Sequence, residues 1–440
     1  MYSVGLYTLG CKVSQYETEA VREEFERRGF EIRDFADRCD VYVINTCTVT
    51  QESDRKSRQF IRRAIKTNPD ATVLVMGCYS QRAPKEVFEI DGVSCVIGTE
   101  DKLSLVSVAE KKLSERERGV CPERVMRTTD LKGACFEKMK ITSAPRTRAY
   151  VKIEDGCESK CTYCAISKAR GPVRSKLPED VIDEVITLHQ SGTREIVLTG
   201  IEIGSYGKDF EEKYNLADLI VALDRTRACE RIRIGSLAPE LVSDEFISKV
   251  KKVKILAPHF HLSVQSGSDS VLRGMKRRYN VGRVLNVIEK IRKEIPNAEF
   301  TADLMVGFPG ESEENFRESL DFVEKAGFLD VHVFAYSRRD GTPACEYDGQ
   351  IPENIKRERS DALIKKKNEV RDRVLDKIIS SAETLSVIAE TRDSEGYYTA
   401  HSDTYIETRF YSEDKNLSGE VVTVIPVSHK NGVVLCKIKE

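Results

Sequence analysis

Short apolar runs alternate with helical patterns along most of this 440-residue chain, and this alternation restricts the possible folds more than any other feature. Helical patterns over residues 17–28 and 53–66 separate three early runs that end at glycine or a polar residue: SVGLYTLG, DVYVINT and ATVLVMG. Runs this rich in β-branched residues are typical of parallel strands buried on both faces. We therefore expect residues 1–140 to form a doubly wound α/β domain, with a charged, irregular linker over residues 110–145.

The alternation resumes at residue 146 with six further strand-like runs: AYVKIEDG, EIVLTG, RIRIGSL, HFHLSVQS, EFTADLMVG and DVHVFAY. Helical patterns such as residues 178–190 and 312–325 separate these runs, and a highly charged helical segment follows at residues 356–377. Six β/α units predict a parallel sheet curled into a partial (β/α)6 barrel. We place this central domain at residues 143–373.

The last part of the chain changes from helical periodicity to a period of two. Five short runs carry this pattern: TLSVIAE, GYYTAHS, TYIETRF, GEVVTVIPV and VVLCKI. Strict alternation over several short segments is typical of half-buried antiparallel strands. Residues 374–440 are therefore predicted to form a small antiparallel β-barrel. The fold class predicted for the whole chain is α/β, with three domains.

Composition limits the environment in which such a chain works. Thirteen cysteines in 440 residues are too sparse for a disulfide scaffold. The first residues lack the pattern of a secretory signal, and no stretch is apolar enough to span a bilayer, so we expect no membrane association and a cytoplasmic protein with reduced thiols. The formal net charge is −2, so only local basic patches can favour nucleic acid.

Three cysteines occur together in the segment DGCESKCTYC, directly after the first predicted strand of the barrel. Cys157, Cys161 and Cys164 offer three soft ligands, whereas a structural zinc needs four and disulfides need an even number. Three thiolates can hold three irons of a [4Fe-4S] cluster and leave the fourth iron open to a ligand. The alternatives are a structural zinc loop and three cysteines without a joint role. Placement at the carboxyl end of a barrel strand favours the cluster.

A second group of cysteines is dispersed along the first domain. Cys11, Cys47 and Cys78 each follow one of its three predicted strands. Parallel strands present their carboxyl ends at one edge of the sheet, where α/β folds bind ligands. We therefore expect these three thiols to converge and to hold a second cluster with an open iron, although a single buried cysteine is usually only a small apolar residue.

The Cys-x3-Cys-x2-Cys spacing, with Tyr163 before the last cysteine, resembles that of the radical S-adenosylmethionine superfamily. Over nearly its whole length the chain resembles the methylthiotransferases of that superfamily, and the final β module resembles a TRAM domain, an RNA-binding barrel. The motifs that carry the resemblance are TLGCKVSQYETEA, VINTCTVTQESDRKSR, VMGCYSQ, KIEDGCESKCTYCAISKARGPVRS, LTGIEIGSYG, HLSVQSGSDSVLRGMKRRY and VGFPGE. The chain departs from the usual family pattern at Ser14, Ser167 and Glu202.

This resemblance implies two [4Fe-4S] clusters and S-adenosylmethionine as cofactors. The Cys157 cluster would bind and reductively cleave S-adenosylmethionine to a 5′-deoxyadenosyl radical, with an electron from a flavodoxin-type or ferredoxin-type donor. The cluster on the first-domain cysteines would deliver sulfur and methyl to the substrate carbon. Strand ends of such barrels contact S-adenosylmethionine, and the residues carried over for this role are Tyr163, Gly200, Ser236 and Gln265.

Within the family, the segments from Cys11 to Glu17 and from Ser53 to Arg58 are most similar to the branch that modifies C2 of N6-threonylcarbamoyladenosine at position 37 of tRNA. The implied partner is the tRNA anticodon loop, whose unpaired base an enzyme can take into the barrel. Basic side chains near the predicted active edge are candidates for phosphate contacts, although a solvated helix face is the default for any one run. These candidates are Arg55, Arg58, Arg338 and Arg339.

Other functions remain open on the sequence alone. Related branches act on isopentenyladenosine at position 37 or on a ribosomal protein side chain, and a non-catalytic iron–sulfur electron carrier is a more remote alternative. An electron carrier normally fills all four ligand positions with cysteine, which this chain does not do in either group.

Overall fold

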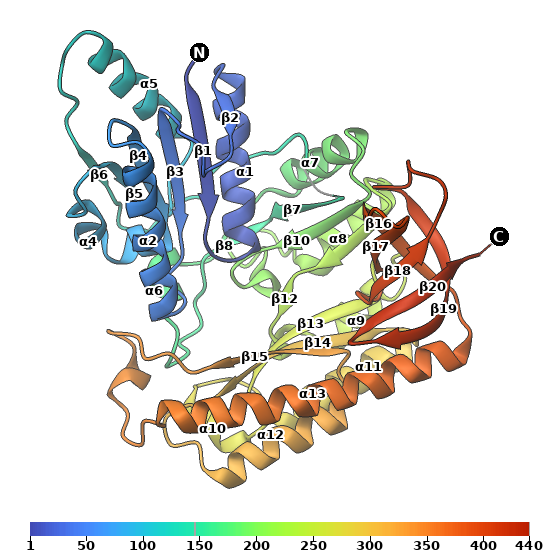
Figure 1. Cartoon of the computed structure of the whole chain (residues 1–440). Coiled ribbons are helices and arrows are strands. Elements are labelled where there is room, and N and C mark those ends of the chain that lie inside the picture. Colours follow the sequence, from blue (N-terminus) through green and yellow to red (C-terminus); the bar gives the residue numbers. More distant parts are fainter. Residues whose placement is uncertain (145–146, 440) are drawn as a thin grey trace.

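The first sheet of the computed structural model, which describes residues 1–144 and 147–439, contains six parallel strands in the order β2-β1-β3-β4-β5-β6. They are β1 Ser3–Thr8, β2 Glu31–Arg33, β3 Val41–Thr46, β4 Thr72–Gly77, β5 Val93–Ile97 and β6 Val125–Arg127. The helices are α1 Lys12–Arg27, α2 Gln51–Thr67, α3 Cys78–Arg82, α4 Pro84–Phe88 and α5 Ser104–Glu117. Helices α1 and α5 pack on one face and α2 on the other, as in a doubly wound fold (Figure 1).

The predicted linker at residues 110–145 is partly wrong. Its first residues belong to α5, and β6 completes the edge of the first sheet by pairing with β5. Charged side chains interrupt the apolar pattern of α5, so its periodicity is weak, and β6 is only three residues long. Short edge strands carry little sequence signal of their own.

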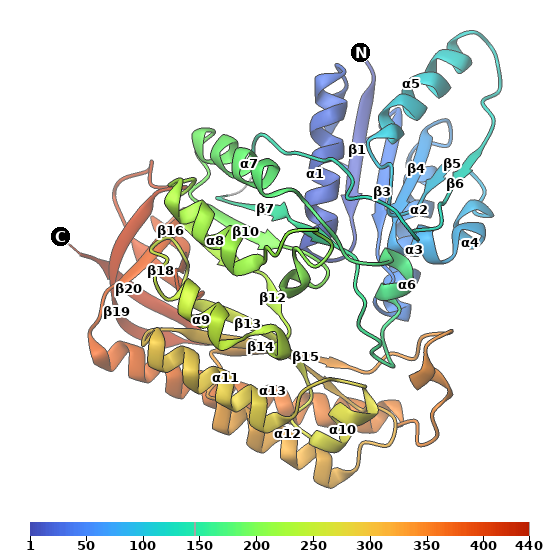
Figure 2. The same cartoon turned by 180° about the vertical axis from the view of Figure 1, so that it is seen from behind.

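The central part curls six parallel β units into an open barrel (Figures 1 and 2). Its parallel strands form a three-stranded and a four-stranded sheet. Its strands are β7 Arg148–Lys152, β10 Glu195–Thr199, β11 Arg231–Ile234, β12 Ser236–Leu237, β13 His259–Gln265, β14 Glu299–Val306 and β15 Asp330–Ala335. Gly235 separates β11 from β12 within what is otherwise one unit. A two-stranded antiparallel ladder, β8 Glu154–Asp155 with β9 Arg174–Ser175, follows β7.

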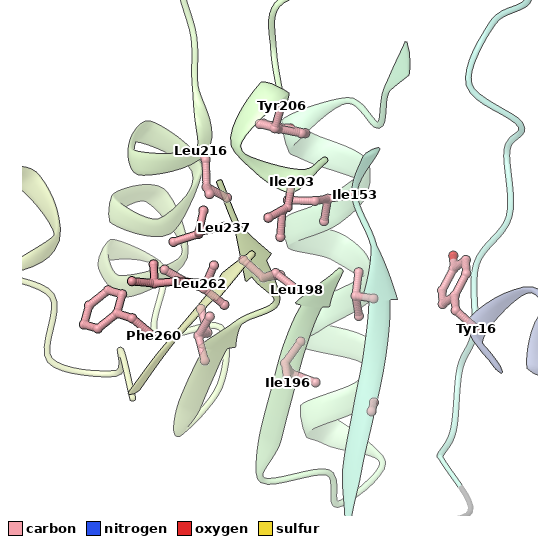
Figure 3. Packing of buried hydrophobic residues seen from close by; sticks show 14 of the residues in the cluster. Tyr16, Ile153, Ile196, Leu198, Ile203, Tyr206, Leu216, Leu237, Phe260 and Leu262 are labelled. Carbon is pink, nitrogen blue, oxygen red and sulfur yellow. The ribbon is translucent and has the colours of Figure 1, made fainter. Parts of the chain in front are cut away.

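Helices cover the outside of this barrel. They are α7 Pro178–Gln190, α8 Leu216–Arg225, α9 Asp244–Val250, α10 Asp269–Gly274, α11 Val281–Glu294 and α12 Glu313–Ala326, with short 3-10 turns at Ile203–Ser205, Pro239–Leu241 and Pro343–Glu346. The short helix α6 Ile166–Arg170 packs instead against α3 of the first domain. One apolar core joins the first domain to the barrel, because α1 packs on β7 as well as on its own sheet. Figure 3 shows this core, with Ile196, Leu198 and Phe260 between the strands and the helices.

The longest helix, α13 Glu353–Ser381, runs along β15 and α12 to the last module (Figure 2). That module is a closed barrel of β16 Leu385–Arg392, β17 Tyr397–Ser402, β18 Glu407–Tyr411, β19 Val421–Lys430 and β20 Val433–Ile438. Four of its strand pairs are antiparallel, as expected, but β18 and β20 pair in parallel and close the barrel. Within residues 1–144 and 147–439, no helix is both long and apolar enough to cross a bilayer.

Candidate active site

The Cys157 loop leaves the carboxyl end of β7 and is fixed by backbone contacts at several points. Gly156 has φ +92°, and a Cβ there would lie 1.8 Å from the Pro172 carbonyl oxygen, so only glycine fits. The Cys157 N–H donates to the Gly171 carbonyl at 2.9 Å. Buried Thr162 donates through its hydroxyl to the Gly274 carbonyl at 2.9 Å. The loop that carries the three thiols is therefore held against two other parts of the barrel.

The three thiols of this loop lie in one electrostatic environment. Burial raises the pKa of Cys157 to about 11 and also raises the pKa of Cys164, with neighbouring thiols adding to both shifts. The Ile166 N–H donates to Cys164 Sγ at 3.4 Å, and Arg277 Nη1 donates to Cys161 Sγ at 3.2 Å. Arg277 belongs to the basic run Arg273, Lys276, Arg277 and Arg278, yet it points inward and donates to the Ser263 carbonyl as well.

Three glutamates around this loop keep a buried carboxylate oxygen without a hydrogen-bond partner in the described part of the chain: Glu154, Glu202 and Glu240. Burial raises the pKa of Glu202 to about 7 and raises that of Glu154 well above its usual range. Unpaired buried acceptors are costly, and a bound donor or cation relieves that cost. A ligand with an ammonium and a sulfonium group, as in S-adenosylmethionine, fits this set of carboxylates.

The strand-end residues predicted to contact that cofactor occupy different surroundings. Gly200 follows β10 directly, and a Cβ there would lie 2.6 Å from Glu154 Oε2. Gln265 ends β13 in a left-handed conformation, with φ +76°, and is buried. Ser236 is exposed at the start of β12. Tyr163 packs against an apolar cluster that includes Phe308.

The three first-domain cysteines follow β1, β3 and β4, which are adjacent in the sheet. Gly10 has φ +120°, and a Cβ there would lie 3.4 Å from Cys47 Sγ, so this glycine brings the Cys11 backbone close to Cys47. Burial raises the pKa of Cys78 to about 12, and the thiols of Cys47 and Cys11 raise it further. Cys47 and Cys78 are buried, whereas Cys11 is exposed.

Neither cysteine group forms a ready-made site for a single metal ion. In the described ranges, no three His, Cys, Asp or Glu side chains are arranged to hold one metal ion. A four-iron cluster differs, because each thiolate binds a different iron. Each group offers three thiols, one fewer than the four ligands of a structural zinc, and the cluster stays a prediction for both.

A buried ion network, which the sequence did not reveal, joins the two cysteine groups. Arg170 at the end of α6 is fully buried and donates through Nε to Cys78 Sγ at 3.1 Å. The same guanidinium pairs with Glu17 at 2.5 Å and with Asp155 at 3.1 Å. Lys152 pairs with both carboxylates as well. Although burial opposes ionisation, Lys152 and Arg170 lower the pKa of Asp155 to about 2.

Replacing Arg170 by methionine is expected to lower the free energy of unfolding of the cluster-free protein by about 3 kcal/mol, because it removes one of the two cations that buried Glu17 and Asp155 share and leaves only Lys152 between them. Urea unfolding monitored by circular dichroism measures this change. Arg27→Met on α1 is the matched control, since its pair with Glu24 is exposed and contributes little. Equal midpoints for both variants would contradict the role of Arg170.

The four arginines predicted to contact RNA lie around one cavity of about 840 Å³ between the first domain and the segment after β15. Arg55 and Arg338 are exposed, and Arg58 donates to the Tyr79 hydroxyl at 2.8 Å. Arg339 is buried and donates to Thr48 at 2.7 Å and to Asp54 at 2.8 Å. Arg339 therefore fastens the barrel to the first domain.

Comparisons with known proteins agree with this arrangement. Residues 151–323 match the Radical SAM superfamily, and residues 3–98 match a family described as "Uncharacterized protein family UPF0004". The solved structure of the radical S-adenosylmethionine methyltransferase TsrM from Kitasatospora setae has the same fold, with a TM-score of 0.56 and 14% identity over 95% of this chain and 84% of that chain.

Curated relatives match nearly the full length. The threonylcarbamoyladenosine tRNA methylthiotransferase MtaB of Bacillus subtilis is 39% identical over 96% of this chain and 93% of its own, and its namesake from Thermotoga maritima is 35% identical over 99% and 97%. A tRNA-2-methylthio-N(6)-dimethylallyladenosine synthase from Carboxydothermus hydrogenoformans is 33% identical over 82% of each chain. The chain belongs to the tRNA methylthiotransferase family of radical S-adenosylmethionine enzymes.

Proposed function

We propose that this enzyme inserts a methylthio group at C2 of N6-threonylcarbamoyladenosine at position 37 of tRNA. The observation that carries the proposal is the full-length similarity to two relatives named for that substrate, at 39% and 35% identity. The second candidate is the dimethylallyladenosine substrate, which the name of the 33% identical relative supports. The dimethylallyladenosine substrate ranks second because the relative named for it has a lower sequence identity and matches a smaller part of this chain.

Two [4Fe-4S] clusters and S-adenosylmethionine are the proposed cofactors. Cys157, Cys161 and Cys164 would hold one cluster, and Cys11, Cys47 and Cys78 the other. When bound, the cofactors supply radical cleavage of an unactivated C–H bond and the sulfur and methyl groups that replace the hydrogen. The chain's own residues would orient them: Glu154 and Glu202 would accept from the ammonium of S-adenosylmethionine and offset the charge of its sulfonium, and Gly200, Gln265, Ser236 and Tyr163 would border its site.

Arg277 and Arg170 have a supporting role in this proposal. Each donates a hydrogen bond to one ligand sulfur, at 3.2 Å to Cys161 and 3.1 Å to Cys78. Hydrogen bonds to cysteine sulfur and nearby positive charge set the redox properties of such centres. The protein thus fixes the thiols and their electrostatic surroundings before the metal arrives.

The proposed RNA partner is the anticodon loop of tRNA. Arg55, Arg58 and Arg338 line a cavity next to the segment after β15, and the β16–β20 barrel supplies a second surface beside the open barrel. We assign the three predicted domains, 1–140, 143–373 and 374–440, to sulfur delivery, radical generation and RNA binding. A flavodoxin-type or ferredoxin-type protein in the cytoplasm would supply the electron.

The test is expression of this chain in a Bacillus subtilis strain that lacks its own MtaB, followed by mass analysis of tRNA nucleosides. The expected result is the return of 2-methylthio-N6-threonylcarbamoyladenosine. An empty vector and the Cys157→Ala variant are controls. If only the isopentenyl nucleoside gained a methylthio group, the second candidate would replace the first.

A further inference from the structure

A cavity of about 310 Å³ lies between the open barrel, α13 and the β16–β20 barrel. Its polar lining combines imidazole, hydroxyl and cationic groups with the carboxyl groups of Asp330 and Glu407. Its other polar side chains include Lys12, Arg233, His259, His261, Thr301 and Tyr405. The volume is at the lower end of the range for small-molecule sites, so it suits a substituent of a larger substrate.

Strand β13 connects this cavity to the proposed cofactor site. Phe260 and Leu262 point into the core (Figure 3), so His259 and His261 occupy the opposite face, where they line the cavity. A register shift between Leu262 and Gln265 interrupts this alternation before the strand ends at Gln265. At about 3.3 Å per residue, His261 lies roughly 13 Å below Gln265 along the strand. A nucleobase held near the clusters can therefore extend a side chain into the cavity.

The polar side chains on this wall contact one another, and one ring nitrogen among them has no partner in the described part of the chain. Thr301 Oγ1 lies 2.9 Å from His259 Nε2 and 2.8 Å from His261 Nδ1. Asp303 contacts both His261, at 3.1 Å, and His332, at 3.2 Å, so its carboxylate is occupied. His259 is buried, and its Nδ1 has no hydrogen-bond partner among the described residues. This unpaired nitrogen belongs to a side chain that lines the cavity.

Three basic side chains line the cavity, Lys12, Arg233 and Arg371, and they differ in the partners they already have. Arg371 lies 3.8 Å from Asp372 Oδ1. Arg233 pairs with Glu195 at 2.9 and 3.0 Å and donates to the Asp403 carbonyl at 2.9 Å, which fastens the barrel to the last module. Lys12 follows Cys11 directly, and in the described part of the chain its ammonium makes neither a hydrogen bond nor an ion pair. Lys12 is thus a partly buried cation with space in front of it. Anionic groups are the ligands that such a site favours.

We propose that Lys12 binds the carboxylate of the threonylcarbamoyl group, while His259 and Thr301 meet the polar atoms beside it. This inference rests on the proposed substrate, whose N6 substituent ends in a carboxylate and a hydroxyl. A dimethylallyl substituent has neither group and would leave Lys12 and His259 Nδ1 unpaired in the cavity. Sites built to bind a polar group discriminate strongly against analogues that lack it.

The experiment compares two synthetic anticodon stem-loop RNAs on the cluster-loaded enzyme. One carries threonylcarbamoyladenosine at position 37, and the other carries the same group with a carboxamide in place of the carboxylate. We measure Kd without S-adenosylmethionine and kcat/KM with it. Wild-type enzyme should favour the carboxylate RNA by about 30-fold or more, as for loss of one partner of a buried charge pair. Lys12→Met should remove most of this preference, and Lys12→Arg should keep much of it.

Lys111→Met is the matched control, since this lysine is exposed on α5 and should leave the preference at the wild-type value. Equal loss of affinity for both RNAs in Lys12→Met would indicate a phosphate contact and overturn the proposal, as would equal use of both RNAs by wild-type enzyme. Failure of the proposed function looks different: wild-type enzyme would then form no methylthio product from either RNA. Iron content distinguishes lost clusters from lost binding, and the wild-type comparison remains decisive if Lys12→Met loads poorly.

Discussion

Replacing Cys157, Cys161 and Cys164 together by alanine is expected to abolish reductive cleavage of S-adenosylmethionine and to lower the iron content from about eight to about four atoms per chain. The three thiols are the soft ligands of one loop, held by Gly156 and Thr162, and nothing beside the loop replaces them. Iron and sulfide analysis after anaerobic reconstitution measures the first effect. Chromatography of 5′-deoxyadenosine after chemical reduction measures the second.

The matched control replaces three cysteines outside both groups: Cys121, Cys135 and Cys229. Two of these are exposed and one is buried, so their loss should leave iron content and cleavage close to wild type. Retention of about eight irons in the first variant would show that the loop cysteines hold no cluster. Equal iron loss in the control would indicate damaged folding instead.

Much of the fold was predictable because its elements are strongly periodic. Helix α7 has the predicted bounds, Pro178–Gln190, and all six β units of the barrel lie where apolar runs predict them. The sequence also indicated both cysteine groups. Cys157, Cys161 and Cys164 share one loop, and Cys11, Cys47 and Cys78 each follow a strand of a parallel sheet, whose strand ends align. Local patterns were sufficient at these positions.

The residues that the sequence missed depend on long-range packing. Arg170 and Glu17 are 153 positions apart, and only the docking of α1 against β7 brings them together. Arg277 lies in a basic run that resembles an RNA contact, yet tertiary packing turns it toward Cys161. Arg339 likewise binds Asp54 across the domain boundary. Periodicity does not reveal which charged side chain becomes buried, because that choice depends on the partner it meets.

Replacing Cys11, Cys47 and Cys78 by alanine should separate the two halves of the proposed reaction. The variant should lose about half of the iron and all detectable methylthio product, while it continues to cleave S-adenosylmethionine to 5′-deoxyadenosine. The cleavage site keeps its own three cysteines, Glu154 and Arg277, none of which lies in the first domain. Nucleoside mass analysis and 5′-deoxyadenosine measurement on the same sample test both expectations.

The coupling between the sites makes this experiment demanding, because Arg170 touches both Cys78 and the Asp155 carboxylate. Loss of the Cys78 thiol removes one acceptor but leaves the pairs with Glu17 and Asp155, so the network should persist and the barrel should stay folded. Circular dichroism and the urea midpoint, compared with those of the three-cysteine control, check this. A folded variant that still forms the methylthio product would assign these cysteines a structural role. A folded variant that loses cleavage as well would show that the first cluster is needed for radical generation.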